Sequence, residues 1–337
     1  MEAYSNGCKL CQIGAKMVLF VTGVCARSCF YCPLSGHRKG QDAVYANERQ
    51  VNCDADLIDE TRSMDALGTG VTGGEPLLVL ARVCHYLALL KYEFGAEHHI
   101  HLYTSLPPSV NTLRALARSG LDEIRLHPSL EEWDAFATSR YRGALKYAKT
   151  LGMEVGVEIP AIKPVPAILS VLQEVSGFLN LNELEFSETN YDAMTNAGFV
   201  PLTSGYAAAG SREMAKRIAD GEVPTYFCSS ASKDRVQLRE RFKRKARRLA
   251  RPFDEVTEDG TLVFGVVESM QRDDYPADIS DEDYMVVNGD MFTSWQLTFA
   301  LAKNHPELAK KARVVEMLPD GTVIEVTPLS SCLKPKT

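Results

Sequence analysis

The chain has 337 residues, 45% of them apolar, and carries 37 Lys and Arg against 44 Asp and Glu, a net charge of −7. This composition excludes intrinsic disorder and supplies apolar material for about two domains. The longest apolar run, Met17–Cys25, is too short to span a bilayer. Residues 1–16 show no secretory signal, so we expect a cytoplasmic protein. In a reducing compartment, some of the nine cysteines are expected to bind metal or to react rather than to form disulfides.

From Met17 onward, short runs rich in β-branched and aromatic residues alternate with longer segments of helical period, which is typical of βα units. Six such units predict an α/β fold: a partial (β/α)6 barrel of the TIM type, with site residues at the carboxyl ends of its strands. The expected strands are Met17–Gly23, Gly70–Gly73, His98–Thr104, Glu123–His127, Glu154–Ile159 and Glu183–Ser187. The expected helices are Asp54–Leu67, Leu77–Phe94, Val110–Ser119, Leu130–Leu151 and Pro166–Leu179.

The regular alternation ends near residue 190. Segment Lys233–Arg251 carries ten basic and two acidic residues, a local charge of 10 − 2 = +8, and its apolar spacing predicts an amphipathic helix. An acidic stretch, Asp273–Asp290, comes later. The Asp-Gly pairs at 259–260 and 320–321 predict hairpins on either side of a helix at Trp295–Ala312. We therefore expect an extension at 1–16, the barrel at 17–205, a helical connection at 206–252 and a small α+β unit at 253–337.

The strongest motif directly follows the first expected strand, where Cys25, Cys29 and Cys32 form a C-x3-C-x2-C pattern. Three thiolates at this spacing can hold three irons of a [4Fe-4S] cluster and leave the fourth iron open to a ligand. A structural zinc completed by His37 is the alternative, because cytosolic zinc sites usually complete their own tetrahedron. The pattern favours the cluster with an open position.

This loop, with Tyr31 just before the last cysteine, resembles the cluster motif of the radical S-adenosylmethionine (SAM) superfamily. Segment Thr72–Pro76, which reads TGGEP at the end of the second strand, resembles that family's GGEP element. The resemblance covers about residues 15–190. It implies that SAM binds the cluster and is cleaved by an electron to a 5′-deoxyadenosyl radical, which takes hydrogen from a substrate. It also implies a low-potential electron donor of the ferredoxin or flavodoxin type.

The same resemblance implies roles for individual residues. Gly73 and Gly74 would let the backbone approach SAM, and Glu75 would accept a hydrogen bond from its ammonium group. Tyr31 is expected to lie against adenine or else to pack in the core. Arg125 would meet a cofactor carboxylate or form a structural ion pair. Other polar residues at strand ends are expected near SAM or substrate, or else to be satisfied core groups: Thr104, Ser105, His127, Glu158, Ser187, Glu188 and Asn190.

Cys8 and Cys11 form a C-x2-C pair ahead of the first strand, a spacing that suits two ligands of one metal. Cys228, just before the basic segment, is the candidate third ligand of a site for a second iron–sulfur cluster or zinc. The alternatives are a redox-active or incidental pair and, for Cys228, a reactive thiol. Cys53 and Cys84 are expected to be small core residues, and Cys332 is expected to be incidental.

Two classes of function follow. The first is a radical SAM enzyme acting on a macromolecule, preferably a protein or peptide, with RNA modification or sulfur insertion as alternatives. The second is a non-catalytic iron–sulfur electron-transfer protein, which would not need Gly73–Glu75. The barrel and cysteine loop are similar to those of pyruvate formate-lyase activating enzymes and archaeal relatives. The basic segment would bind RNA, an acidic partner or, as the simplest account, the chain's own acidic stretch.

Overall fold

The structure is a computed structural model that describes residues 5–203, 205–219, 221–269, 280 and 282–332. Residues 273–279 and 281 of the acidic stretch Asp273–Asp290 lie outside these residues. By its internal contacts the chain forms two units, one of Met1–Arg62 with Ala66–Gln237 and one of Ser63–Asp65 with Leu238–Thr337. Within the described ranges, no helix is both long and apolar enough to cross a membrane.

A nine-stranded sheet forms the centre of the first unit, in the order β3-β2-β1-β4-β5-β6-β7-β8-β9. The strands β1 and β4 to β9 run parallel to their neighbours, whereas β2 and β3 form an antiparallel hairpin on β1. The strands are β1 (Lys16–Phe20), β2 (Tyr45–Ala46), β3 (Arg49–Gln50), β4 (Gly68–Thr72), β5 (His99–Thr104), β6 (Glu123–Leu126), β7 (Glu154–Pro160), β8 (Phe178–Asn182) and β9 (Thr225–Cys228).

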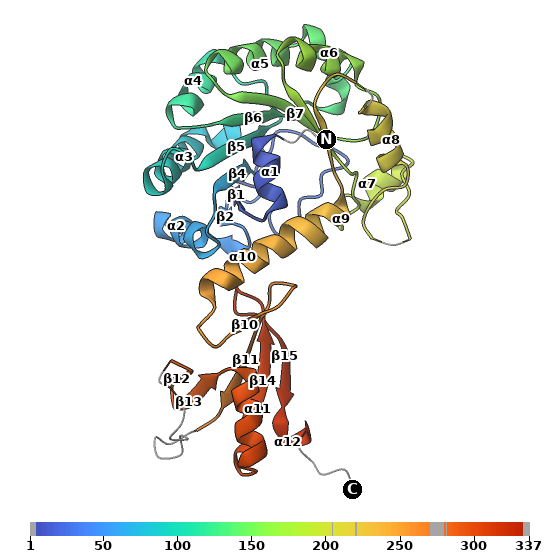
Figure 1. The fold of residues 1–337 in the computed structure, drawn as a ribbon. Coiled ribbons are helices and arrows are strands. Elements are labelled where there is room, and N and C mark those ends of the chain that lie inside the picture. Colours follow the sequence, from blue (N-terminus) through green and yellow to red (C-terminus); the bar gives the residue numbers. More distant parts are fainter. Residues whose placement is uncertain (1–4, 204, 220, 270–279, 281, 333–337) are drawn as a thin grey trace. The chain divides into compact units, whose positions relative to one another are not determined.

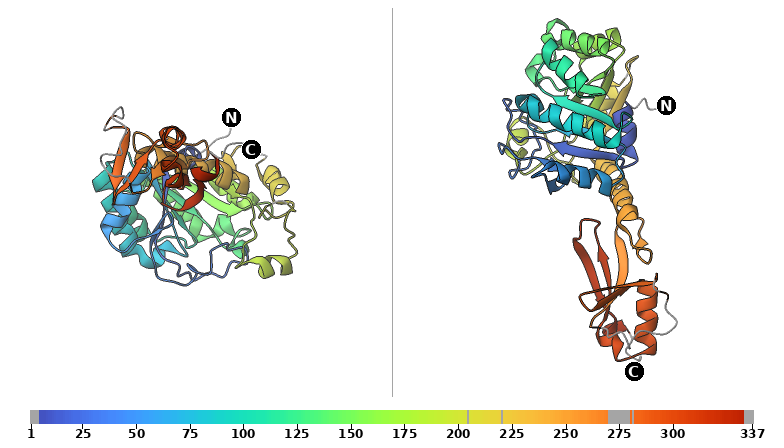
Figure 2. Two further views of the ribbon diagram at one scale, coloured as in Figure 1. Left: turned by 90° about the horizontal axis from the view of Figure 1, so that it is seen from below. Right: turned by 90° about the vertical axis from the view of Figure 1, so that its left-hand side faces the viewer.

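Figures 1 and 2 show helices α2 to α6 on the outer side of this sheet and α1 on its inner side. Together with the strands, the helices confirm the α/β fold and its six βα units, after which β9 adds a strand that the sequence analysis does not predict. The helices are α1 (Asn6–Gln12), α2 (Asp54–Ser63), α3 (Leu80–Phe94), α4 (Val110–Arg118), α5 (Arg140–Thr150), α6 (Pro166–Glu174), α7 (Tyr191–Asn196) and α8 (Ser211–Ile218), with the short turn η1 (Pro76–Val79) before α3.

The predicted strand Glu183–Ser187 is wrong, because the sixth strand of the repeat is β8, at Phe178–Asn182. The sequence suggests otherwise because Asn180 and Asn182 interrupt the apolar pattern of β8, and both donate hydrogen bonds to a buried carboxylate inside the barrel. The apolar residues that suggested a strand, Leu184 and Phe186, instead pack in a separate buried cluster.

The predicted helix Leu130–Leu151 is also wrong in its extent, because it is divided into η2 (Leu130–Glu132), η3 (Phe136–Thr138) and α5. The first and the last of these pieces begin at a capping serine. Ser129 and Glu132 form a capping box, and the Ser139 side chain accepts a hydrogen bond from the Tyr141 amide at the start of α5. A capping serine satisfies amides that would otherwise lack partners, so these serines start new helices.

An antiparallel sheet in the order β12-β13-β11-β14-β15, with β10 on β11, forms the second unit. Helix α11 packs on β11, where an added Cβ on Gly265 would lie 1.7 Å from Thr298 Oγ1. The predicted Asp-Gly turns join β10 to β11 and β14 to β15, and Gly260 and Gly321 have the positive φ that such turns use. The elements are β10 (Glu255–Val256), β11 (Leu262–Val267), β12 (Tyr284–Val287), β13 (Asp290–Thr293), α11 (Trp295–Asn304), η6 (Leu308–Lys310), β14 (Ala312–Met317), β15 (Val323–Pro328) and α12 (Leu329–Cys332).

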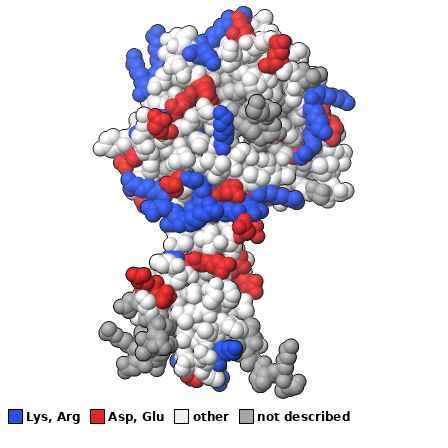
Figure 3. All heavy atoms as spheres, in the orientation of Figure 1, with Lys and Arg blue, Asp and Glu red and all other residues white. Residues whose placement is uncertain are grey.

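The basic segment is helical in three pieces: α9 (Ser230–Ser232), the π-helical turn η4 (Lys233–Leu238) and α10 (Arg239–Leu249). Figure 3 shows Lys and Arg side chains gathered over α10. Part of this charge is compensated nearby in sequence, because Lys243 Nζ lies 3.0 Å from Glu258 and 3.4 Å from Glu240. Arg247 and Arg248 remain exposed on the helix.

Candidate functional site

The loop that carries Cys25, Cys29 and Cys32 begins beside the GGEP segment. The amide of Gly74 donates to the Thr22 carbonyl (2.7 Å), and the amide of Glu75 donates to the Val24 carbonyl (2.9 Å). An added Cβ on Gly74 would lie 2.4 Å from that Val24 oxygen, and one on Gly73 would lie 2.6 Å from the Thr22 oxygen. Both glycines are therefore needed for the close approach of two backbone segments, and their predicted contact with SAM stays a prediction.

Arg27, within the cysteine loop, anchors that loop over the end of β5. Its guanidinium donates to the Ser105 carbonyl (3.2 Å) and the Tyr141 hydroxyl (3.1 Å), and it pairs with Glu132 at 3.0 Å. Its Nε is buried and has no hydrogen-bond partner among the described residues. Arg27 is not among the residues predicted from the sequence, although a charged residue between two candidate metal ligands is itself a signal.

Tyr31 anchors the other end of the loop. It is buried with Leu184 and Phe186, and its hydroxyl lies 3.1 Å from His127 Nε2. His127 Nδ1 lies 2.6 Å from the Glu158 carbonyl, so Nδ1 carries the proton and Nε2 accepts from Tyr31. Burial lowers the pKa of His127, which keeps the ring neutral. Tyr31 and His127 thus position the cysteine loop over the ends of β6 and β7.

Glu75 is completely buried between the GGEP segment and the end of β5. One carboxylate oxygen accepts from Thr104 Oγ1 (2.6 Å) and the Leu77 amide (3.0 Å). The other accepts from the Ser105 amide (2.7 Å) and hydroxyl (2.6 Å). A carboxylate offers about four acceptor positions. The chain's own donors therefore fill all of these positions. Glu75 thereby connects the ends of β4 and β5 in this structure.

The thiol of Cys25 is exposed, and those of Cys29 and Cys32 are partly exposed. Partial burial by the surrounding loop raises the pKa of the Cys25 and Cys29 thiols. A single zinc would hold its sulfur ligands about 3.8 Å apart. No cysteine belongs to a set of three potential ligand atoms within 4.8 Å of one another in the described part of the chain. Accessible soft ligands at wider spacing, beside the unpaired Nε of Arg27, fit an iron–sulfur cluster better than zinc with His37.

Arg125 forms the centre of a buried polar network inside the barrel. Its guanidinium pairs with Glu123 and, at 2.7 Å, with Glu158, and it donates to the Tyr103 hydroxyl (2.9 Å). It also donates to Ser5 at 3.0 Å, so the N-terminal residues close this network. Arg125 is therefore a structural ion-pair residue in this chain, the second of the two predicted possibilities, and Glu158 has its required partner.

The remaining predicted residues differ in their placement. Asn190 is buried and donates to the Tyr31 and Glu185 carbonyls, so it holds the cysteine loop. Ser187 donates its amide to Asn190, whereas Glu188 is exposed. The expectation that Cys53 is a core residue is wrong, because its side chain is exposed before α2. Cys84 is partly buried, and the Cys332 side chain lies outside the described residues.

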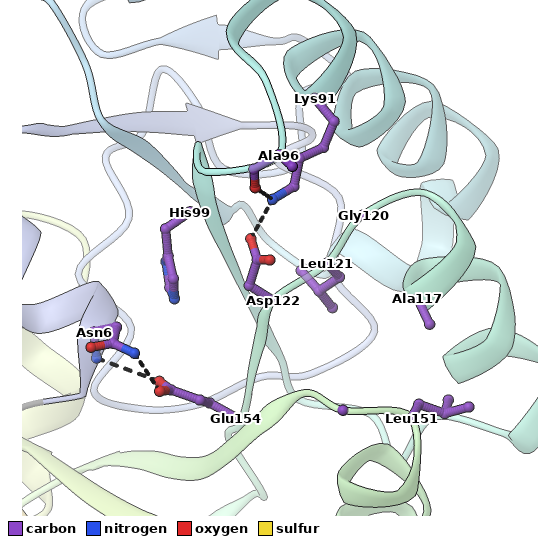
Figure 4. Close-up of a pocket in the computed structure, with 11 residues that line it drawn as sticks. Asn6, Lys91, Ala96, His99, Ala117, Gly120, Leu121, Asp122, Leu151 and Glu154 are labelled. Atoms are coloured by element: carbon purple, nitrogen blue, oxygen red, sulfur yellow. Dashed lines mark hydrogen bonds and ion pairs between the residues drawn. The ribbon is translucent and has the colours of Figure 1, made fainter.

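A pocket of about 690 Å³ opens at the other end of the barrel, near the starts of β5, β6 and β7 (Figure 4). His99 and Glu154 line it, and their ligand atoms lie within 4.8 Å of Glu123. The Lys16 ammonium lies 2.7 Å from His99 Nδ1, and Asn6 already donates to Glu154. Glu123 in turn pairs with Arg125, so the chain's own groups already engage all three potential ligands and this set is a poor metal site.

A protein of Methanocaldococcus jannaschii named "Putative glycyl-radical enzyme activating enzyme MJ0021" is 41% identical to this chain over 286 residues, which cover 80% of this chain and 75% of that protein. The chain belongs to the radical SAM superfamily. It is therefore a radical SAM enzyme with SAM and a [4Fe-4S] cluster as cofactors, and not a non-catalytic electron-transfer protein. No family model matches the chain.

Three solved structures of radical SAM proteins show weaker likeness. SuiB of Streptococcus suis bound to its precursor peptide SuiA gives a TM-score of 0.47 at 14% identity, over 72% of this chain and 53% of that chain. Methylornithine synthase gives 0.39 at 14% identity, over 56% and 63%. The methyltransferase TsrM of Kitasatospora setae gives 0.37 at 14% identity, over 57% and 41%. This radical SAM chain thus spans only about half of the length of such structures.

Proposed function

We propose that this radical SAM enzyme removes a hydrogen atom from a protein or peptide, and that the position attacked is the Cα of a glycine in a partner protein. The observation that carries the proposal is the 41% identity, over 80% of the chain, to a protein named as an activating enzyme for glycyl-radical enzymes. The exposed thiol of Cys25 supports it, because the cluster would then lie where a large substrate can reach it.

The chain's own residues would hold and shape this centre. Cys25, Cys29 and Cys32 would ligate the cluster, and reductive cleavage of SAM there supplies the radical that takes the hydrogen. The unpaired Nε of Arg27, within the same loop, would be a donor for an anionic group bound beside the cluster. Glu75 positions Thr104 and Ser105 at the strand ends. A low-potential ferredoxin or flavodoxin in the cytoplasm would supply the electron.

Isotope transfer tests the substrate class. The anaerobically reconstituted enzyme is incubated with SAM, dithionite and the protein fraction of a host extract grown on α-deuterated glycine, and 5′-deoxyadenosine is analysed by mass spectrometry. We expect one deuterium in the product, since the hydrogen would come from glycine Cα. Product without deuterium, or deuterium that comes only from the small-molecule fraction, would overturn the proposal.

A Cys25→Ala variant provides the catalytic control. It should form no 5′-deoxyadenosine above background with or without the protein fraction, because one ligand of the cluster is lost. Cys84→Ala is the matched control, since this partly buried thiol lies on α3 outside the cysteine loop. It should retain normal product formation.

A further inference from the structure

Three other cysteines converge inside the barrel, away from the cysteine loop. Cys8 and Cys11 lie on α1, about one helical turn apart, so their side chains share one face. Cys228 is the last residue of β9, at the far edge of the parallel sheet. Cys11 interacts electrostatically with both Cys8 and Cys228, and Cys228 interacts with Cys8. Residues separated by more than half of the chain are thus brought together.

Hydrogen bonds fix α1 against β8 and β9. Gln12, at the end of α1, donates from Nε2 to the Tyr226 hydroxyl on β9 (2.7 Å). Asn180 on β8 donates from Nδ2 to Cys8 Sγ (3.2 Å). Asn182, two residues further along β8, is the register partner of Cys228. Both sides of the cysteine group are therefore held by ordered secondary structure.

The surroundings of these sulfur atoms supply hydrogen-bond donors and positive charge. Gln237 Nε2 donates to Cys228 Sγ at 3.4 Å, as Asn180 does to Cys8. Burial raises the pKa of all three thiols, to about 12 for Cys11, whereas the nearby charge of Arg125 lowers it for Cys8 and Cys11 and that of the partly exposed Lys233 lowers it for Cys228. N–H donors and positive charge next to sulfur ligands are the means by which proteins support metal-bound thiolates.

One buried polar atom beside Cys8 has no partner. Asn180 is only 2% exposed, and its Oδ1 accepts no hydrogen bond from the described residues. An unsatisfied buried amide oxygen costs about 1–3 kcal/mol. Its position next to three convergent thiols is a second sign that this part of the barrel interior is built around a group that the chain itself does not supply.

We propose that Cys8, Cys11 and Cys228 bind a second iron–sulfur cluster inside the barrel. The ligand type selects zinc or an iron–sulfur cluster. The three sulfur atoms do not form a set within 4.8 Å in the described residues, so the site is too wide for one zinc ion, which holds its sulfur ligands about 3.8 Å apart. The site is independent of the substrate proposed above.

Metal analysis of a variant that lacks the first cluster tests this site directly. We take the Cys25→Ala, Cys29→Ala, Cys32→Ala variant, reconstitute it anaerobically, and measure iron, sulfide and the EPR spectrum after dithionite reduction. We expect about four irons and about four sulfides per chain, as for one [4Fe-4S] cluster, with a reduced-cluster signal. A variant with no iron, or with zinc instead, would overturn the proposal.

A further substitution then locates the ligands. Because Cys8 is buried, Cys228→Ser is the decisive change, and it should abolish the remaining iron and EPR signal. Cys84→Ser in the same background should retain both. Far-UV circular dichroism of the metal-free chains should be identical, which separates ligand loss from unfolding. Iron retained by Cys228→Ser, or a Cys8–Cys11 disulfide found by mass spectrometry in the anaerobically purified chain, would contradict the assignment.

Discussion

The mouth of the barrel and its interior both contain polar residues, but the two regions differ in whether the chain itself supplies partners for these residues. At the mouth, Cys25 is exposed and Arg27 keeps a buried Nε without a partner. In the interior, Arg125 is paired with Glu123 and Glu158 and closed over by Ser5. The difference teaches that a polar residue indicates a ligand site where the chain leaves it unsatisfied, as it does Arg27 at the mouth and Asn180 Oδ1 in the interior, and not where the chain pairs it, as it does Arg125.

Breaking the interior network should produce the largest effect on stability. Arg125→Met leaves Glu123 and Glu158 buried without their cation, so we expect the free energy of unfolding to fall by about 3–5 kcal/mol. Urea denaturation of the metal-free chain measures this. Arg142→Ala, which removes an exposed pair with Glu174, is the control and should cause no measurable loss. If both substitutions lowered the free energy of unfolding equally, the buried network would contribute no more to stability than the exposed ion pair.

At the mouth, Glu75→Gln tests a carboxylate whose acceptor positions are all filled by hydrogen-bond donors of the chain itself. The amide keeps the volume of the side chain but places an N–H group against existing donors. We expect the free energy of unfolding to fall by about 1–3 kcal/mol. If Glu75 only positions the strand ends, the KM for SAM should change together with stability, and Glu75→Asp should restore neither. A variant of normal stability with a raised KM would instead support the predicted contact with the ammonium group.

Burial of His98, between Thr69 and Phe94, predicts that the stability of the chain depends on pH. Its ring is buried against Thr69, and burial, followed by Lys16 and Lys91, lowers its pKa from 6.5 to about 4. Between these values the unfolded chain binds a proton that the folded chain does not, so stability falls as the pH falls. We expect a contribution of about 2 kcal/mol to be lost between pH 8 and pH 5.

The His98→Gln variant provides the comparison for this pH dependence. It removes the titrating group, so its stability should fall less steeply than that of the unmodified chain over the same range. Unfolding curves at several pH values measure both slopes. Parallel curves would show that His98 is already accessible to protons in the folded state.

The smallest effect is expected at Glu188, which is exposed at the mouth. Glu188→Gln should leave the free energy of unfolding within about 0.5 kcal/mol of the unmodified value. Its predicted role in cofactor binding is tested by the KM for SAM, and an unchanged KM would remove it from the site. This substitution also provides a baseline for the other changes at the mouth.

The repeating βα order and the cysteine loop after β1 could be predicted because glycine-ended helices, apolar strands and cysteine spacing are local signals. The strand β8 could not be predicted, because its polar residues Asn180 and Asn182 donate hydrogen bonds to Glu158, which is distant in the sequence. The saturation of Glu75 was hidden for the same reason, since its donors Thr104 and Ser105 lie on another strand end. The sequence shows which chemical group a polar residue carries, but it does not show which distant residue that group will bind.

The docking of α1 has a consequence for the order of events during synthesis of the chain. Ser5 bonds to Arg125, Gly7 donates its amide to Glu123, and Cys8 accepts from Asn180. These residues precede β6 and β8 in the chain, so they find their partners only after both strands have left the ribosome. Contacts of such long sequence separation form slowly. Helix α1 is therefore made before the barrel strands but buried after them, and Cys8 and Cys11 stay accessible to cellular thiol chemistry until the barrel forms around them.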